Sequence, residues 1–90
     1  MPVMTDELTI TNTLGLHLRP AQQLVQTVLN FACEVFISKD GQRVNAKSIM
    51  GLLTLAAARG TRLSITCDGD DAEDALKAVR ALIESGFGEQ

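Results

Sequence analysis

The spacing of apolar residues changes several times along the chain, between the two-residue repeat of a strand and the 3.6-residue repeat of a helix. The stretch "ELTITNT" alternates and places Leu8 and Ile10 on one face, which predicts a strand. From Pro20 the apolar residues follow the spacing of a helix, at positions 21, 24, 25, 28 and 29. Asn30 is a suitable residue for this helix to end at. Proline fits the first turn of such a helix, where its missing N–H has no helical partner anyway.

The next segment, "CEVFISKDGQRVNA", predicts a hairpin. Val35 and Ile37 face one way, Phe36 faces the other, and Asp40-Gly41 is a strong two-residue turn signal. If the face that carries Phe36 is open to solvent, this side chain is exposed.

The second half of the chain predicts a short apolar helix, another strand and a longer helix. Ser48 is the expected N-cap of the short helix, "IMGLLTLAAARG", and Gly60 closes it. The strand "TRLSITC" directs alternate residues inward (Leu63, Ile65 and Cys67). Asp70 and Glu73 form a start resembling a capping box for the long helix, and Gly86 is its C′ residue with Phe87 folding back. Its inner stripe is Ala72, Leu76, Val79 and Ile83, flanked by Leu82.

The resulting order is βαββαβα, in which each strand has one apolar face. We therefore expect an α+β fold, an open-faced β-sandwich with a four-stranded antiparallel sheet and three helices on one face. Ninety residues make one small domain, spanning 1–90. The strand order does not follow from these patterns.

Composition narrows the classes of function. The formal net charge of −3, with three Phe and neither Tyr nor Trp, argues against nucleic acid as a partner. Cys33 and Cys67 are too few for a disulfide scaffold and lack neighbouring ligands for zinc, so we expect buried thiols and no metal. We see no signal peptide and no apolar run long enough to span a membrane, and we expect a reducing, cytoplasmic environment.

The only histidine, His17, lies just before the predicted first helix, in "TNTLGLHLRP". A helix N-terminus presents free N–H groups and a partial positive charge, which favour phosphate. Arg19 adds a permanent cation suited to phosphate oxygens, and a neutral imidazole is a nucleophile near neutral pH. A reversible phosphoryl carrier needs only these groups and a docking surface. A polar cap on a surface loop is the ordinary alternative, and nothing in the sequence supplies an oriented hydrolase triad.

The segment "NAKSIMGLLTL" carries more apolar side chains than one helix can bury in a small core. We expect some of these side chains to form an exposed patch that contacts a partner, and Met50 suits such a surface. The alternative is that all five belong to the core, above all Leu52 and Leu55; the full set is Ile49, Met50, Leu52, Leu53 and Leu55.

Two segments together resemble the HPr family, the histidine-containing phosphocarriers of the phosphoenolpyruvate-dependent phosphotransferase system. "GLHLRPA" is similar to the phosphorylated-histidine motif and "KSIMG" to the regulatory-serine motif, and Ser48 lies 31 positions after His17 (48 minus 17). The resemblance implies that His17 accepts a phosphoryl group on Nδ1 from phospho-enzyme I and passes it to an enzyme II A domain. It implies no cofactor and no catalytic turnover of the chain's own.

The same resemblance assigns roles to other residues. Arg19 would steady the phosphoryl group, and Ser48 would be the site of an HPr kinase/phosphorylase in organisms that have one. Ile49, Met50 and Leu53 match docking positions, and Leu18, which stands where the family usually has a small residue, would add docking surface or crowd the acceptor. The tail "IESGFGEQ" resembles nitrogen-branch relatives, whereas "KSIMG" resembles the serine-regulated carbon branch. The alternative is a regulatory binding module that acts through Ser48 and the adjacent apolar patch.

Overall fold

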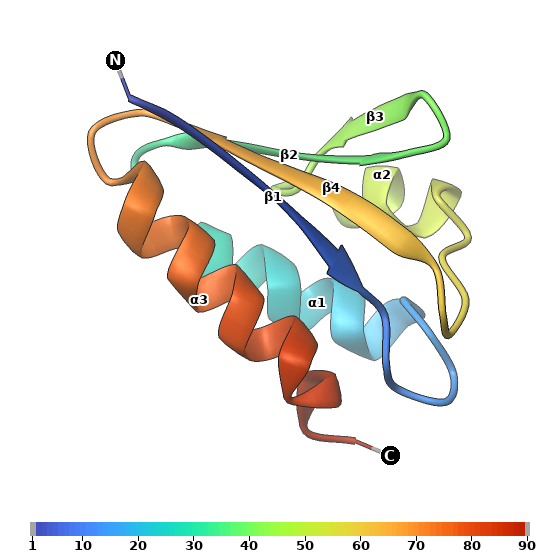
Figure 1. Ribbon diagram of the computed structural model, residues 1–90. Helices are drawn as coiled ribbons and strands as arrows, with labels where there is room; N and C mark the ends of the chain where they lie inside the picture. The colour runs from blue at the N-terminus through green and yellow to red at the C-terminus, as the bar shows by residue number, and fades with distance from the viewer. Residues whose placement is uncertain (1, 90) are drawn as a thin grey trace.

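The fold is described by a computed structural model that covers residues 2–89. The elements follow the expected order: β1 (Val3–Thr9), α1 (Leu18–Val28), β2 (Glu34–Lys39), β3 (Gln42–Asn45), α2 (Ile49–Thr54), β4 (Arg62–Asp68) and α3 (Ala72–Glu84), with a short 3-10 turn, η1 (Gly86–Gly88), after α3. Figure 1 shows the three helices on one side of the sheet. The predicted α+β open-faced sandwich is confirmed.

The four strands form one antiparallel sheet in the order β1-β4-β2-β3. β4, the last strand in sequence, lies between β1 and β2, an order that the apolar pattern does not encode. Asp40 and Gly41 both adopt positive φ in the β2–β3 turn, which confirms the predicted hairpin and its turn residues.

The core lies between the sheet and the helices, and it consists of the predicted inward stripes. Leu63, Ile65 and Cys67 are at most 1% exposed in β4, and the inner stripe of α3 is also buried. Leu29, assigned to the apolar stripe of α1, is instead 61% exposed, because α1 ends at Val28 and Leu29 is its C-cap. Cys33 and Cys67 are buried free thiols, as expected; burial first, and then Asp71, raises the pKa of Cys33 to about 12.

Three local predictions are corrected by the structure. α2 ends at Thr54 rather than near Gly60, and Ala56 adopts a φ of 50° just beyond it. The N-cap of α3 is Asp71, not Asp70, and no capping box forms. The Asp71 carboxylate accepts instead from the backbone N–H groups of Ala32 and Cys33, so it ties the start of β2 to α3.

Phe36 lies on the open face of the sheet, as its position in the strand predicts. It is half-buried rather than exposed, because the Arg43 guanidinium on the neighbouring strand β3 lies 4.0 Å from the centre of its ring. The charged side chain therefore covers the aromatic one.

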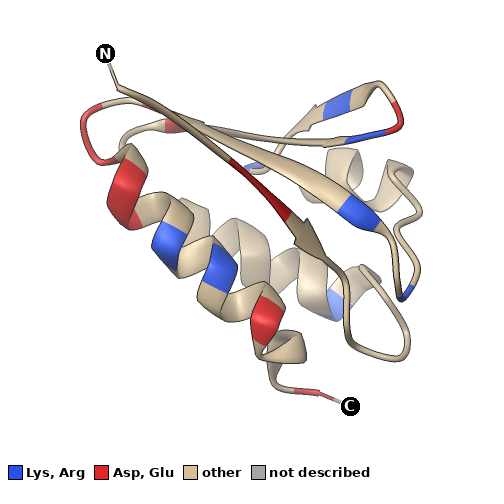
Figure 2. Cartoon of the chain, in the orientation of Figure 1, with Lys and Arg blue, Asp and Glu red and all other residues tan. Residues whose placement is uncertain are grey.

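Charged residues are unevenly distributed over the molecule. Figure 2 shows acidic residues gathered where α3 begins, at the end of the sheet away from the start of α1. The residues of this acidic end are Asp68, Asp70, Asp71, Glu73 and Asp74. None of the helices within residues 2–89 has the length and apolar character needed to cross a membrane.

Candidate phosphoryl-transfer site

His17 is the N-cap residue of α1, as the sequence predicts. Its backbone is extended (φ −87°, ψ −169°), and its carbonyl accepts the first helical hydrogen bond, from Ala21, at 3.0 Å. Its side chain makes no capping hydrogen bond. The helix begins at Leu18, so Pro20 lies in its first turn, as the sequence predicts.

The loop before His17 is held against the segment that follows α2. Leu16 N–H donates to the Ala57 carbonyl at 2.8 Å, and Gly15 has a φ of 72°. A Cβ at Gly15 would collide with the backbone of Ala57 and Ala58. Only glycine therefore allows the loop to approach this backbone so closely.

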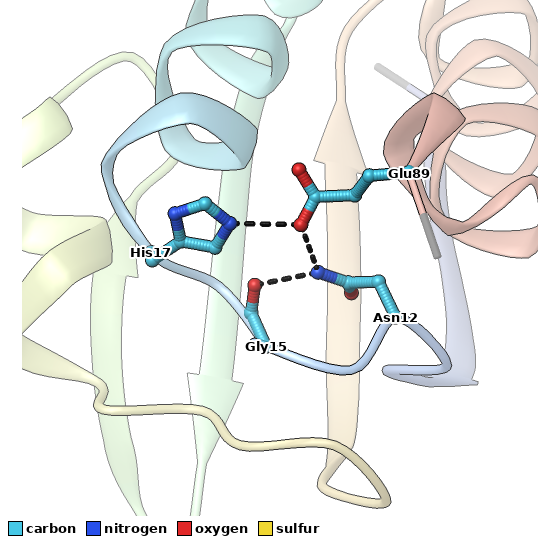
Figure 3. Close-up of polar contacts among 4 residues, drawn as sticks. All are labelled: Asn12, Gly15, His17 and Glu89. Atoms are coloured by element: carbon cyan, nitrogen blue, oxygen red, sulfur yellow. Dashed lines mark hydrogen bonds and ion pairs between the residues drawn. The ribbon is translucent and has the colours of Figure 1, made fainter.

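The imidazole contacts a residue that the sequence analysis did not single out, Glu89. Nε2 of His17 lies 2.8 Å from Oε1 of Glu89, and Figure 3 shows the other ring nitrogen pointing away from that carboxylate. Because an ionised carboxylate only accepts hydrogen bonds, this contact places a proton on Nε2. The His17 side chain is 36% exposed and that of Glu89 is 21% exposed, so the site is open to solvent.

Asn12 completes this group and was also missed. Its Nδ2 donates to Oε1 of Glu89 at 3.0 Å and to the Gly15 carbonyl at 2.8 Å (Figure 3). The hydrogen bond from His17, followed by that from Asn12, lowers the pKa of Glu89 below its ordinary value of 4.5, with a smaller contribution from the positive charge of Arg19. Glu89 is therefore ionised at neutral pH.

The remaining predicted site residues lie on or beside α1 and α2, which pack against each other. Arg19 is exposed and Leu18 is 52% exposed. In α2, Met50 is 71% exposed, Ile49 and Leu53 are half-buried, and Leu52 belongs to the core, as does Leu55 just after the helix. The five apolar residues of this segment therefore divide between surface and core.

Ser48 is the N-cap of α2, as predicted. Its Oγ accepts a hydrogen bond from the Gly51 N–H at 3.0 Å, and the residue is exposed. The hydroxyl is thus both a structural cap and accessible.

A shallow hollow of about 190 Å³ lies beside the imidazole. Leu14, Leu16 and His17 line one side of it, and residues 56–58, which follow α2, line the other. Leu14 is 71% exposed at its rim. No group of three or more His, Cys, Asp or Glu residues in the part of the chain described here could hold a metal ion.

Residues 4–85 match the family model described as the PTS HPr component phosphorylation site. The chain is 45% identical to the phosphocarrier protein HPr of Xylella fastidiosa (strain Temecula1), over 97% of this chain and 98% of that protein. It is 44% identical to the HPr-like protein Crh of Bacillus subtilis, over 78% of this chain and 82% of that one. The crystal structure of HPr-C-His from Thermoanaerobacter tengcongensis superimposes with a TM-score of 0.93 at 44% identity, covering 97% and 98% of the two chains.

The fold and these matches define a phosphocarrier, which is a substrate of phosphoryl transfer rather than a catalyst. The chain belongs to the HPr family of the phosphotransferase system.

Proposed function

We propose that His17 accepts a phosphoryl group on Nδ1 from phospho-enzyme I, in a chain of transfers that begins at phosphoenolpyruvate, and passes it to an enzyme II A domain or its nitrogen-branch equivalent. The observation that carries this proposal is the position of the only histidine at the N-terminus of α1, with Nε2 occupied by Glu89. Nδ1 is then the free nucleophilic nitrogen.

The surroundings of His17 suit a transient dianion. Among residues 2–89, no acceptor pairs with the backbone N–H of Leu18 or Arg19, and Pro20 has no N–H to compete. Donors at a helix N-terminus stabilise phosphate, and Arg19, which is exposed nearby, supplies a cation for its oxygens. Because these groups act on a solvent-exposed site, they stabilise the phosphoryl group without burying it.

Labelling tests the proposal directly. The protein is incubated with catalytic enzyme I and labelled phosphoenolpyruvate, and acid-labile, alkali-stable phosphate is measured. We expect one phosphoryl group per wild-type chain, none in His17→Ala, and slower or less stable labelling in Arg19→Ala with an intact fold. Ser48→Ala, which leaves the imidazole in place, is the matched control and should be labelled fully. Absence of label in the wild type would remove the proposal.

We further propose that phosphorylation of Ser48 by an HPr kinase/phosphorylase regulates docking. A phosphate there would add about two negative charges beside Ile49 and Met50. An acidic partner surface would then be repelled without any unfolding. The comparison of Ser48→Asp with Ser48→Asn isolates the charge, because both residues cap helices well. We expect slower transfer from enzyme I only for Ser48→Asp, and equal rates for the two variants would contradict this role.

Leu18, Ile49, Met50 and Leu53 form the proposed docking surface. Leu18 and Met50 are exposed and Ile49 and Leu53 are half-buried, on two helices that pack against each other. Apolar side chains exposed together are typical of a contact surface, and methionine adapts to several partners.

A second candidate function is a regulatory binding module that acts through Ser48, with transfer by His17 secondary. The similarity to proteins named HPr-like protein Crh, in Halalkalibacterium halodurans and Bacillus subtilis, favours it. The two candidates predict different results. A carrier is labelled on His17 and passes the label to an acceptor. A regulatory module binds its partner equally well in the wild type and in the His17→Ala variant.

A further inference from the structure

We infer that Glu89 is a positioning residue for phosphoryl transfer. The buried amide of Asn12 holds the Glu89 carboxylate in place. The carboxylate keeps the proton on Nε2 of His17 and stabilises the charged imidazole ring that forms when Nδ1 is phosphorylated. This inference rests on the proposed function of His17 and deepens it. In the sequence, Glu89 lies 72 positions from His17 and 77 positions from Asn12.

The first argument is the geometry of the carboxylate. Oε1 of Glu89 receives donors from two directions, Nε2 of His17 at 2.8 Å and Nδ2 of Asn12 at 3.0 Å. A carboxylate in this position selects the imidazole tautomer with hydrogen on Nε2 and leaves the lone pair on Nδ1. A second ring nitrogen therefore cannot compete as the acceptor of the phosphoryl group.

The second argument is the state of Asn12. This side chain is 1% exposed, and both of its hydrogen bonds are donated by Nδ2 to oxygen atoms, Gly15 O and Glu89 Oε1. Turning the amide over would set its own oxygen against those two acceptors, so its orientation is fixed. Its Oδ1 is buried and has no hydrogen-bond partner within residues 2–89, a destabilising arrangement. The two hydrogen bonds that Asn12 does make are both donated, and they join the loop before His17 to Glu89.

The third argument is the charge that appears during transfer. The lone pair of Nδ1 attacks phosphorus, the bond from phosphorus to the donor's leaving atom breaks, and its electron pair departs with that atom. The proton on Nε2 does not move, so the His17 ring becomes a phosphorylated imidazolium. The Glu89 carboxylate faces the nitrogen that retains the proton and lowers the energy of this form, as a carboxylate stabilises an imidazolium in hydrolases. The return step runs the same sequence backwards and releases a neutral imidazole.

Charge and position are separated by two substitutions of Glu89. Glu89→Ala removes the acceptor, whereas Glu89→Gln keeps an oxygen that can accept from both Nε2 and Asn12 but lacks the charge. Glu84→Gln, in an exposed residue at the end of α3, is the matched control. With catalytic enzyme I and phosphoenolpyruvate, we expect phosphorylation of Glu89→Ala to be slower by about tenfold, since water can partly replace a carboxylate that is already in contact with solvent. Glu89→Gln should be intermediate and Glu84→Gln should match the wild type.

A spectroscopic readout separates positioning from a structural role. The ¹⁵N shifts of the two imidazole nitrogens, measured on the unphosphorylated protein with the imidazole neutral, report the tautomer. We expect hydrogen on Nε2 in the wild type and in Glu89→Gln, and a mixed population in Glu89→Ala. Asn12→Asp, which is isosteric but replaces the donor by an acceptor, should repel Glu89 and reproduce both effects of Glu89→Ala.

The inference is overturned if Glu89→Ala retains either the wild-type rate or the wild-type imidazole shifts. The tautomer measurement needs no phosphoryl transfer, so it distinguishes two kinds of failure. A wild-type protein that is not labelled by enzyme I removes the carrier function. A labelled wild type with an unaffected Glu89→Ala variant removes only the role of Glu89.

Discussion

The two helices that carry the candidate residues begin in different ways. At the start of α2, the Ser48 hydroxyl accepts from the Gly51 N–H at 3.0 Å, so the helix provides its own cap. At the start of α1, the His17 side chain makes no such bond and turns to Glu89, and the N–H groups of Leu18 and Arg19 meet no acceptor among the described residues. The cap side chain of α2 is thus bonded to the third residue of its own helix, whereas that of α1 is directed to Glu89 and the third residue of α1, Pro20, has no N–H.

The two starts also differ in what holds them. Around Ser48 the contacts are local: its own N–H donates to Asn45 O, and the Lys47 N–H donates to Asn45 Oδ1. Around His17 they are distant in sequence, through the Ala57 carbonyl and Glu89. A site held from several directions by remote segments keeps an uncapped helix start in position, and it is sensitive to changes in those segments.

The largest effect is expected from Gly15→Ala, which disturbs the contact between the loop before His17 and the segment that follows α2. The new Cβ meets the backbone of Ala57 and Ala58, which cannot rotate away, and the residue must also keep a positive φ. We expect a loss of about 3 kcal/mol in the free energy of unfolding, measured with urea.

Gly60→Ala is the control for this prediction. Gly60 has a φ of 88°, but no atom would lie within 4 Å of its Cβ. The only destabilising effect in this variant is the left-handed backbone, so we expect a loss of about 1 kcal/mol in the free energy of unfolding. Equal losses in the two variants would mean that the contact with residues 57 and 58 does not constrain the loop.

A smaller difference is expected when the two N-cap side chains are removed. Ser48→Ala loses a capping hydrogen bond and should cost about 1 kcal/mol of unfolding free energy, which Ser48→Asn should recover. His17→Ala loses no capping bond, and its contact with Glu89 is partly exposed, so we expect a change within about 0.5 kcal/mol at neutral pH. If His17→Ala proved the more destabilising of the two, the contrast between the helix starts would be wrong.

An acid titration tests whether the His17 side chain, unlike that of Ser48, contacts Glu89. The lowered pKa of Glu89 means that the folded protein binds fewer protons than the unfolded chain near the ordinary value of 4.5. The associated stability is present above that pH and is lost as the pH falls through the lower, folded pKa. In His17→Ala the pKa of Glu89 should rise toward 4.5, whereas in Ser48→Ala it should not change. NMR titration of the Glu89 side chain measures both; an unchanged pKa in His17→Ala would contradict the contact.

Local patterns account for most of the fold and for half of the site. Apolar periodicity, together with the turn signal at residues 40 and 41, predicts the four strands and three α-helices. The residues that lie near each other in sequence, His17, Arg19 and Pro20, are placed correctly at the start of α1. The position of β4 inside the sheet depends on packing across the whole chain, so no local pattern contains it.

Asn12 and Glu89 were missed for the same reason. Each is a common polar residue in a loop or beyond the last long helix, and only the fold brings them to the imidazole. The different role of Asp71 likewise follows from tertiary contacts, because Asp71 satisfies N–H groups of the α1–β2 connection rather than those of its own helix. Residues that support a site from a distance thus carry little signal in a single sequence.

The smallest effect on stability is expected from Leu18→Ala, which tests whether the open start of α1 is also a docking surface. Leu18 is 52% exposed, so its truncation should change the free energy of unfolding by less than about 0.5 kcal/mol. Leu29→Ala is a matched control, since Leu29 is 61% exposed at the opposite end of the same helix. If Leu18 contacts the partner, Leu18→Ala should slow transfer from enzyme I by about threefold, while Leu29→Ala leaves it unchanged. Faster transfer in Leu18→Ala would show instead that this side chain crowds the phosphoryl acceptor, and equal rates in both variants would remove Leu18 from the docking surface.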